Sequence, residues 1–266
     1  METDTKLTIE TAAKTLDMVA EFQQGGENVE RYVGNPYVKG DHVAEHSARI
    51  TRLAVYCMPF LLIEFANHPD REHLAEDIYV TVLTHDDDEI VDGFDIRTSI
   101  KEHNAKDGQE VINLSKKLSI LDEVQQKYVL EKFSSFRNKN TLAAKIAKAF
   151  DNISGNQLVV EQKIGMVAPD SAKFAIQYLE KVRGTSQTTD MLIDAQINKI
   201  LAYRKMASSD EKELIFLVDR AGEQEGSSLS KNDLRDLIKK LLEIDVSAYQ
   251  LNKEQIDTPI YGYLNK

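Results

Sequence analysis

Residues Tyr79–Asp95 read YVTVLTHDDDEIVDGFD. An apolar run ends here in the pair His85-Asp86, and more acidic residues follow at once. Ile78, Val82 and His85 recur at spacings of four and three, which places the imidazole on the apolar face of a helix. A buried imidazole beside a buried carboxylate is costly unless something pairs with both. A divalent metal ion would do so, because imidazole nitrogen and carboxylate oxygen are common metal ligands.

The composition of the chain predicts an all-α fold. Its 266 residues include only 12 glycines and 5 prolines, and long stretches are rich in the helix formers Leu, Ala, Lys, Glu and Gln. Hydrophobic residues make up 42% of the chain, which is enough to build a substantial core. We therefore expect a globular helical bundle.

Charge and cysteine content bear on partners and location. A net charge of -11 repels phosphate backbones and anionic lipids, so we expect no duplex nucleic acid and no membrane as partners. The single Cys57 cannot form an internal disulfide, which fits a reducing compartment. The most apolar run, Tyr56–Ala66, is about half a membrane span and is interrupted by Pro59 and Glu64. We expect a cytoplasmic protein.

Local signals set the expected helix boundaries. Thr8 or Thr11 should cap a first helix that Gly25-Gly26 ends. Asp41 should cap a second helix, which Pro59 should kink or break. The residues expected in the core from the first helix are Leu16, Val19, Ala20 and Phe22.

A further helix is expected from about residue 70, leading into His85-Asp86 and ending at Gly93. Later helices are expected at about 99–118, 121–136, 140–163, 169–184, 190–205, 209–221 and 229–244. The polar segment 185–189 is the one candidate domain boundary. We therefore expect a main domain at 1–185, with 186–266 as a helical C-terminal extension packed on that domain or continuing it.

Four residues form a candidate metal shell: His46, His85, Asp86 and Asp151. Each lies on or beside an apolar face of an expected helix, and each alone has an ordinary structural explanation as a core histidine or a capping aspartate. Together, two imidazoles and two carboxylates balance a divalent cation and leave positions for water and substrate. Such an ion lowers the pKa of bound water and polarises a phosphoryl oxygen.

This pattern resembles the HD-domain superfamily of metal-dependent phosphohydrolases, named for its His-Asp pair. The sequence is most similar to the HD-domain 5'-deoxynucleotidase branch, over roughly residues 10–180. HVAEHS at 42–47 resembles the VxEHS segment of that branch, HDDDEI at 85–90 its HDxxE segment, and AFD at 149–151 the segment with its last metal aspartate.

Two further segments resemble that branch with one change each. GFD at 93–95 is similar to its Gly-Asp, with Phe94 as an additional residue. Arg31-Tyr32 resembles its Arg-Trp pair, fifteen residues before the metal histidine. The resemblance therefore implies an HD-domain helical bundle with additional C-terminal helices.

The resemblance also implies roles for individual residues. His46, His85, Asp86 and Asp151 would hold one divalent ion, which could be Co, Mn, Mg or Zn. Glu89 would orient or deprotonate the attacking water, and Asp95 would protonate the leaving sugar oxygen. Arg31 would bind the phosphate, and Tyr32 would pack on the sugar or base.

The function expected from this resemblance is removal of phosphate from (deoxy)nucleoside 5'-monophosphates. A triphosphohydrolase of the same fold is an alternative, but the loop 27–41 offers only Arg31 and Lys39 for a longer phosphate chain. A diiron oxygenase would need additional histidines, and His103 is the only one after His85. A non-catalytic regulatory module also stays open. The nucleotide would be the small-molecule partner, and the resemblance is compatible with a homodimer.

Overall fold

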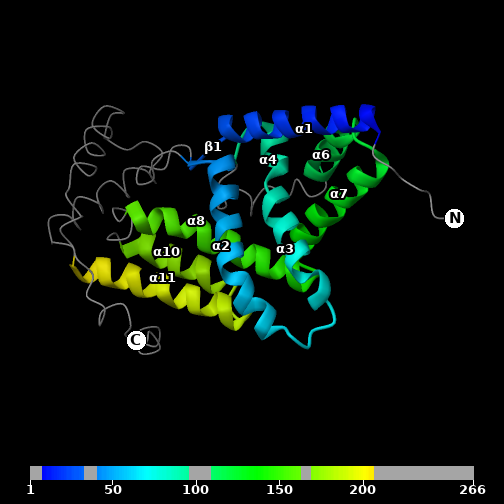
Figure 1. Cartoon of the computed structure of the whole chain (residues 1–266). Helices are drawn as coiled ribbons and strands as arrows, with labels where there is room; N and C mark the ends of the chain where they lie inside the picture. The colour runs from blue at the N-terminus through cyan, green and yellow to red at the C-terminus, as the bar shows by residue number, and fades with distance from the viewer. Residues whose placement is uncertain (1–7, 33–40, 96–108, 163–168, 207–266) are drawn as a thin grey trace, which may run out of the picture. The chain divides into compact units, whose positions relative to one another are not determined.

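The computed structural model describes residues 8–32, 41–95, 109–162 and 169–206, which are almost entirely helical (Figure 1). The predicted all-α class is confirmed. The helices are α1 (Ile9–Asn28), α2 (Val43–Glu64), α3 (Arg71–Thr84), α4 (Asp87–Asp92), α6 (Gln109–Leu118), α7 (Glu123–Asn138), α8 (Leu142–Gln162), α10 (Pro169–Glu180) and α11 (Gln187–Met206). Two short strands, β1 (Glu30–Arg31) and β2 (Asp41–His42), pair antiparallel with Arg31 opposite Asp41.

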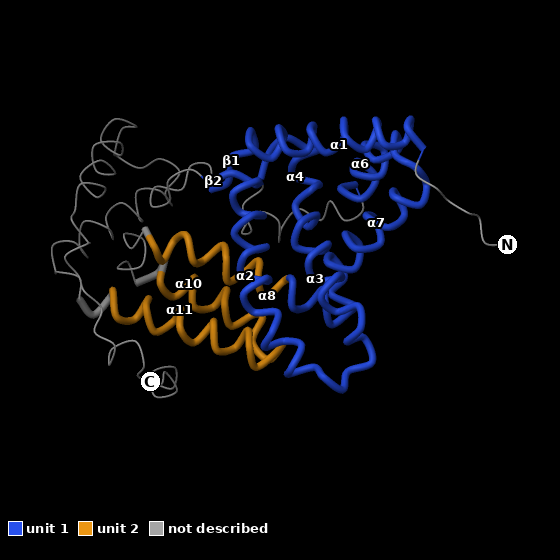
Figure 2. Tube along the Cα trace, viewed as in Figure 1, with its two compact units in different colours: residues 1–33, 40–147 blue, residues 34–39, 148–266 orange. Residues whose placement is uncertain are grey.

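The described residues fall into two compact units (Figure 2), with 8–32, 41–95 and 109–147 in the first and 148–162 and 169–206 in the second. The domain boundary expected near residue 185 stays a prediction. The helices expected at 209–221 and 229–244 lie outside the described residues. Within the described part of the chain, no helix is both long enough and apolar enough to cross a membrane.

In the first unit, α1 crosses the ends of α2 and α4 (Figure 1). Thr8 caps its first turn, as predicted, but Gly25 and Gly26 lie inside the helix and do not end it. Glycine fits at these two positions of α1 because α2 and α4 come close to its backbone. A Cβ on Gly25 would lie 2.5 Å from Ile90 Cγ2, and one on Gly26 would lie 3.3 Å from the backbone nitrogen of Ala44. The two glycines therefore set how α1 packs on α2 and α4.

This close packing also decides which side of α1 is buried. Met18 and the partly buried Phe22 belong to a core cluster with residues of α6 and α7, and they lie on the same stripe as the two glycines. Of the core residues expected from the sequence, Leu16, Val19 and Ala20 are exposed, so that part of the prediction is wrong. The buried residues with which Met18 clusters are Leu114, Leu118 and Phe133.

The second helix begins one residue later than the sequence indicated. His42, not Asp41, occupies the cap position, and its backbone N–H donates to Glu45 Oε2 at 3.2 Å. Asp41 is drawn into the strand pair instead, where it is buried and accepts a hydrogen bond from Arg49 at 2.7 Å.

The expected break at Pro59 does not occur, since α2 continues through it to Glu64. Proline removes the hydrogen bond to the carbonyl of Val55, and both residues are on the exposed side, where water can bond to that carbonyl. The opposite face is buried at Val43, His46, Ile50 and Cys57, while Leu53, at the same helical spacing, is partly buried.

Candidate metal centre

His85 and Asp86 form the junction between two helices. The sequence had indicated one continuous helix, but α3 ends at Thr84 and α4 begins at Asp87. Asp86 takes φ -107° and ψ 16°, outside the helical pattern. Because successive side chains of an unbroken helix do not face each other, this interruption is what allows two consecutive residues to turn toward one point.

The imidazole of His85 is buried on the face that the spacing predicted, with Ile78 and Val82. Its Nδ1 lies 2.9 Å from the backbone oxygen of Val82. A carbonyl can only accept, so in the neutral ring Nδ1 carries the proton and Nε2 presents a lone pair. A backbone carbonyl on the far nitrogen is the usual way a metal-binding histidine is oriented.

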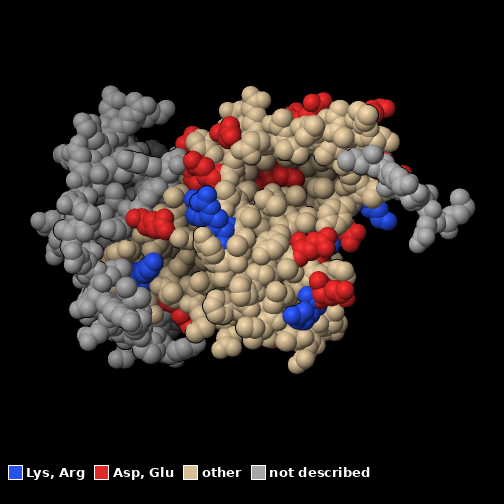
Figure 3. Space-filling view, viewed as in Figure 1, with Lys and Arg blue, Asp and Glu red and all other residues tan. Residues whose placement is uncertain are grey.

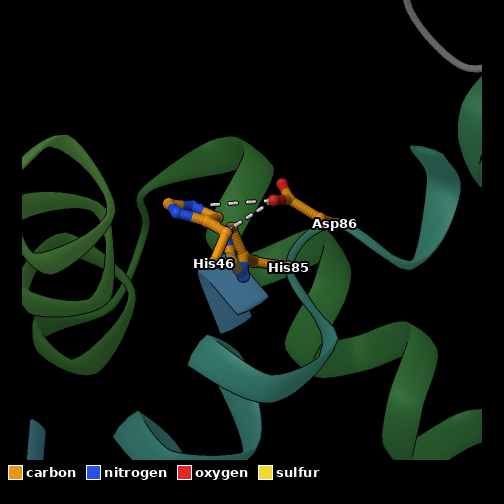
Figure 4. A group of neighbouring side chains, drawn as sticks. All are labelled: His46, His85 and Asp86. Atoms are coloured by element: carbon orange, nitrogen blue, oxygen red, sulfur yellow. Dashed lines mark ion pairs between the residues drawn. The ribbon is translucent and has the colours of Figure 1, made fainter. Parts of the chain in front are cut away.

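Three side chains converge in the first unit (Figure 4). Asp86 Oδ2 lies 3.1 Å from His85 Nε2 and 3.7 Å from His46 Nε2, and the two imidazole rings are 5.4 Å apart. One nitrogen or oxygen from each residue lies within 4.8 Å of the others. These three residues, contributed by α2 and by the α3–α4 junction, were all predicted from the sequence.

The electrostatics at this point call for a cation. Burial alone would raise the pKa of Asp86, but the contact with His85 and the nearby Arg31 and His46 side chains outweigh it and lower that pKa overall. Asp86 is therefore a carboxylate. Its Oδ2 lies 3.1 Å from His85 Nε2, so a cation between these two atoms, either a proton or a metal ion, would pair with both. The donor set of two imidazoles and one carboxylate fits a divalent metal.

Acidic side chains continue from this centre into α4. Figure 3 shows acidic residues in a hollow bordered by α1 on one face of the first unit. Glu89 is buried in the first turn of α4, and its backbone N–H donates to the backbone oxygen of Asp86 at 3.0 Å. Gly93 ends α4 with φ +79°, as the sequence indicated. Glu89 is thereby fixed one turn from a candidate ligand.

The residues expected to bind and process the phosphate ester lie together. Arg31 Nε is 3.8 Å from Asp95 Oδ2, and both side chains are largely buried. The Arg31 guanidinium lies 5.5 Å from the centre of the Tyr32 ring. Tyr32 has φ +60°, a left-handed conformation that costs a non-glycine residue free energy and is often found at functional sites. Arg31 is also among the charges that lower the pKa of Asp86.

The fourth expected ligand, Asp151, belongs to the second unit. It is buried on α8, and Lys148 Nζ donates to its Oδ2 at 2.6 Å. Its binding to the same ion as the other three residues stays a prediction.

Sequence reasoning missed a charged cluster beside the centre. Asp88, in the acidic run after His85-Asp86, is buried and forms an ion pair with Arg137. Arg137 also forms an ion pair with the buried Glu110. Phe136 is buried and contacts the His85 ring. The one available signal was the acidic run itself, since successive carboxylates around a helix cannot all face water.

No protein-family model matches the chain, and no curated protein matches it. A solved structure of a predicted metal-dependent phosphohydrolase from Magnetospirillum magnetotacticum MS-1 is similar, with a TM-score of 0.54 and 19% sequence identity. The similarity covers 75% of this chain and 100% of that chain. At this identity it shows a shared fold, which agrees with the HD-type helical fold expected from the sequence.

Proposed function

We propose that this protein is a metal-dependent phosphohydrolase acting on (deoxy)nucleoside 5'-monophosphates. The observation that carries the proposal is the buried 3.1 Å approach of Asp86 Oδ2 to His85 Nε2, with Val82 fixing the other ring nitrogen. His46 and Asp151 would complete the ligand set. The similar fold of a predicted metal-dependent phosphohydrolase adds support.

The bound ion would supply Lewis-acid chemistry, lowering the pKa of a water and polarising a phosphoryl oxygen. Glu89, one turn from Asp86, would accept the proton of the attacking water. Its burial keeps bulk water from competing with that role.

Arg31 and Asp95 would act on the two sides of the bond that breaks. A guanidinium matches two phosphate oxygens at once, so Arg31 would hold the phosphate. Asp95 lies 3.8 Å from Arg31, so a phosphate bound there has a carboxyl group beside it to protonate the leaving sugar oxygen. The Tyr32 ring beside Arg31 would pack on the sugar or base.

The monophosphate assignment rests on the resemblance and on the number of cations. Of the two cations in the loop 27–41, Arg31 is described beside the centre, and Lys39 lies outside the described residues. A triphosphate chain would need more positive charge than one guanidinium. We therefore rank triphosphohydrolysis second.

The test is a phosphate-release assay over a panel of nucleoside mono- and triphosphates with added Co, Mn, Mg or Zn. We expect orthophosphate from 5'-monophosphates, about one metal ion per chain, and loss of both activity and metal in His85→Ala. The exposed His73→Ala serves as the matched control and should keep both. Tripolyphosphate as product would favour the second candidate, and no product with any metal would refute both.

A further inference from the structure

Two successive residues in the last turn of α7 contact His85 and its surroundings: Phe136 meets the His85 ring, and Arg137 pairs with charged residues of neighbouring helices. Phe136 is buried and meets the His85 ring edge-on, with ring centres 5.2 Å apart and planes at 71°. The same ring is bound at Nδ1 by Val82. His85 is therefore fixed by a hydrogen bond on one nitrogen and by an aromatic contact with another helix.

The next residue, Arg137, links α7 to α4 and α6. Its guanidinium lies 3.9 Å from Asp88 Oδ2 and forms a second ion pair with Glu110. Both carboxylates are buried, with 4% and 9% of their residue surfaces exposed. Buried carboxylates of this kind need a cation, and Arg137 supplies it to two of them at once.

The short helix α4 depends on contacts with its neighbours for its position. α4 has six residues, and isolated helices of that length do not form in water. Its position is therefore set by packing and by charge pairs with its neighbours. Asp88 lies two residues after Asp86 and directly before Glu89, so whatever holds Asp88 also holds those two carboxylates.

We propose that Phe136 and Arg137 are positioning residues of the metal centre: Phe136 sets the plane of the His85 ring, and Arg137 holds α4, and with it Asp86 and Glu89, in register. The proposal rests on the proposed metal-dependent function and goes beyond it by assigning a role to residues that touch neither metal nor substrate.

Substitutions with uncharged side chains can distinguish an effect on the metal ligands from an effect on the stability of the fold. Arg137→Met removes the cation that pairs with two buried carboxylates, so it will also destabilise the protein. A triple variant, Arg137→Met with Asp88→Asn and Glu110→Gln, removes the repulsion and should restore the melting temperature. Phe136→Leu keeps an apolar side chain against His85 without the ring. Lys132→Met is the control, because it removes an α7 cation whose partner is Asp77 of α3.

The measurements are the Co²⁺ dissociation constant, the visible absorption spectrum of the Co²⁺-loaded full-length protein, and kcat. We expect the triple variant to fold like wild type and yet bind Co²⁺ about 10- to 100-fold more weakly, as for other groups that orient metal ligands. We expect Phe136→Leu to alter the Co²⁺ spectrum, and Lys132→Met to change neither affinity nor spectrum.

Two results would overturn the proposal in different ways. If the triple variant and Phe136→Leu keep the wild-type Co²⁺ affinity and spectrum, α7 stabilises the fold only and does not position the ligands. If wild-type protein binds no Co²⁺, the proposed function itself fails, and this inference with it.

Discussion

Gly25 lies so close to Ile90 that a methyl group on the glycine would be 2.5 Å from Ile90 Cγ2. Ile90 directly follows Glu89, so the crossing of α1 over α4 is next to the proposed catalytic carboxylate. There is no space for a side chain on Gly25 at this crossing. The glycine therefore lets α1 pack closely against α4, the helix that carries Glu89.

Gly25→Ala should therefore destabilise the protein and lower kcat. Alanine in a helix normally gains about 1 kcal/mol over glycine, whereas overpacking costs about 1–3 kcal/mol. Urea unfolding should show a net loss for Gly25→Ala and a smaller one for Gly26→Ala, whose nearest contact would be 3.3 Å. Adding Ile90→Ala should reverse part of the loss. A net gain in stability for Gly25→Ala would contradict the packing described here.

Asp86→Asn should remove most of the stabilisation that a bound metal ion gives to the folded protein. At a metal concentration 100 times the dissociation constant, wild type should gain about 2.7 kcal/mol and the variant far less. The exposed Asp17→Asn is the control. Equal metal stabilisation of both proteins would exclude Asp86 as a ligand.

The two non-glycine residues with positive φ, among the described residues, make a matched pair. Tyr32 has φ +60° and Lys139, which ends α7, has φ +52°. Replacing either with glycine should raise the free energy of unfolding by about 1 kcal/mol, because glycine adopts this conformation without strain. Only Tyr32→Gly should also raise KM for the nucleotide, through loss of its ring. If KM is unchanged in Tyr32→Gly, the proposed packing on sugar or base is wrong.

Lys148 and a metal ion would compete for Asp151, since Lys148 Nζ already donates to that carboxylate at 2.6 Å. If Asp151 is the fourth ligand, Lys148→Met should bind Mn²⁺ more tightly than wild type, and Asp151→Asn should bind it at least tenfold more weakly. Isothermal titration of the metal-free protein gives both constants. An unchanged affinity in Asp151→Asn would remove it from the ligand set.

Burial raises the pKa of the Cys57 thiol. The folded protein then keeps this proton to a higher pH than the unfolded chain, whose thiol titrates near about 8.5. The stabilising contribution is complete below that pH and is lost as the pH rises through the folded-state pKa, by at most about 1.4 kcal/mol per pH unit. The stability difference between wild type and Cys57→Ala should therefore shrink between pH 8 and 10. A difference independent of pH would mean that the thiol titrates normally.

Much of the site could be predicted because its ligands follow helical spacing. His46 and His85 lie on buried faces that the 3.6-residue period identifies, and a buried polar residue on such a face needs a partner. The helical class was equally accessible, because it depends on composition and periodicity, which are local properties of the chain. The end of α4 at Gly93, which has a left-handed conformation, was also predictable from the local sequence.

Only the tertiary structure shows where packing between helices overrides the local signals for helix ends and caps. Gly25 and Gly26 stay helical because another helix lies against them, and Asp41 leaves its cap position because Arg49 and a strand partner bind it. Arg137 and Asp88 lie 49 positions apart in the sequence, and no pattern in either segment predicts the pair. Spacing along one helix fixes which way a side chain faces, but which distant side chain meets it depends on how the helices pack against one another.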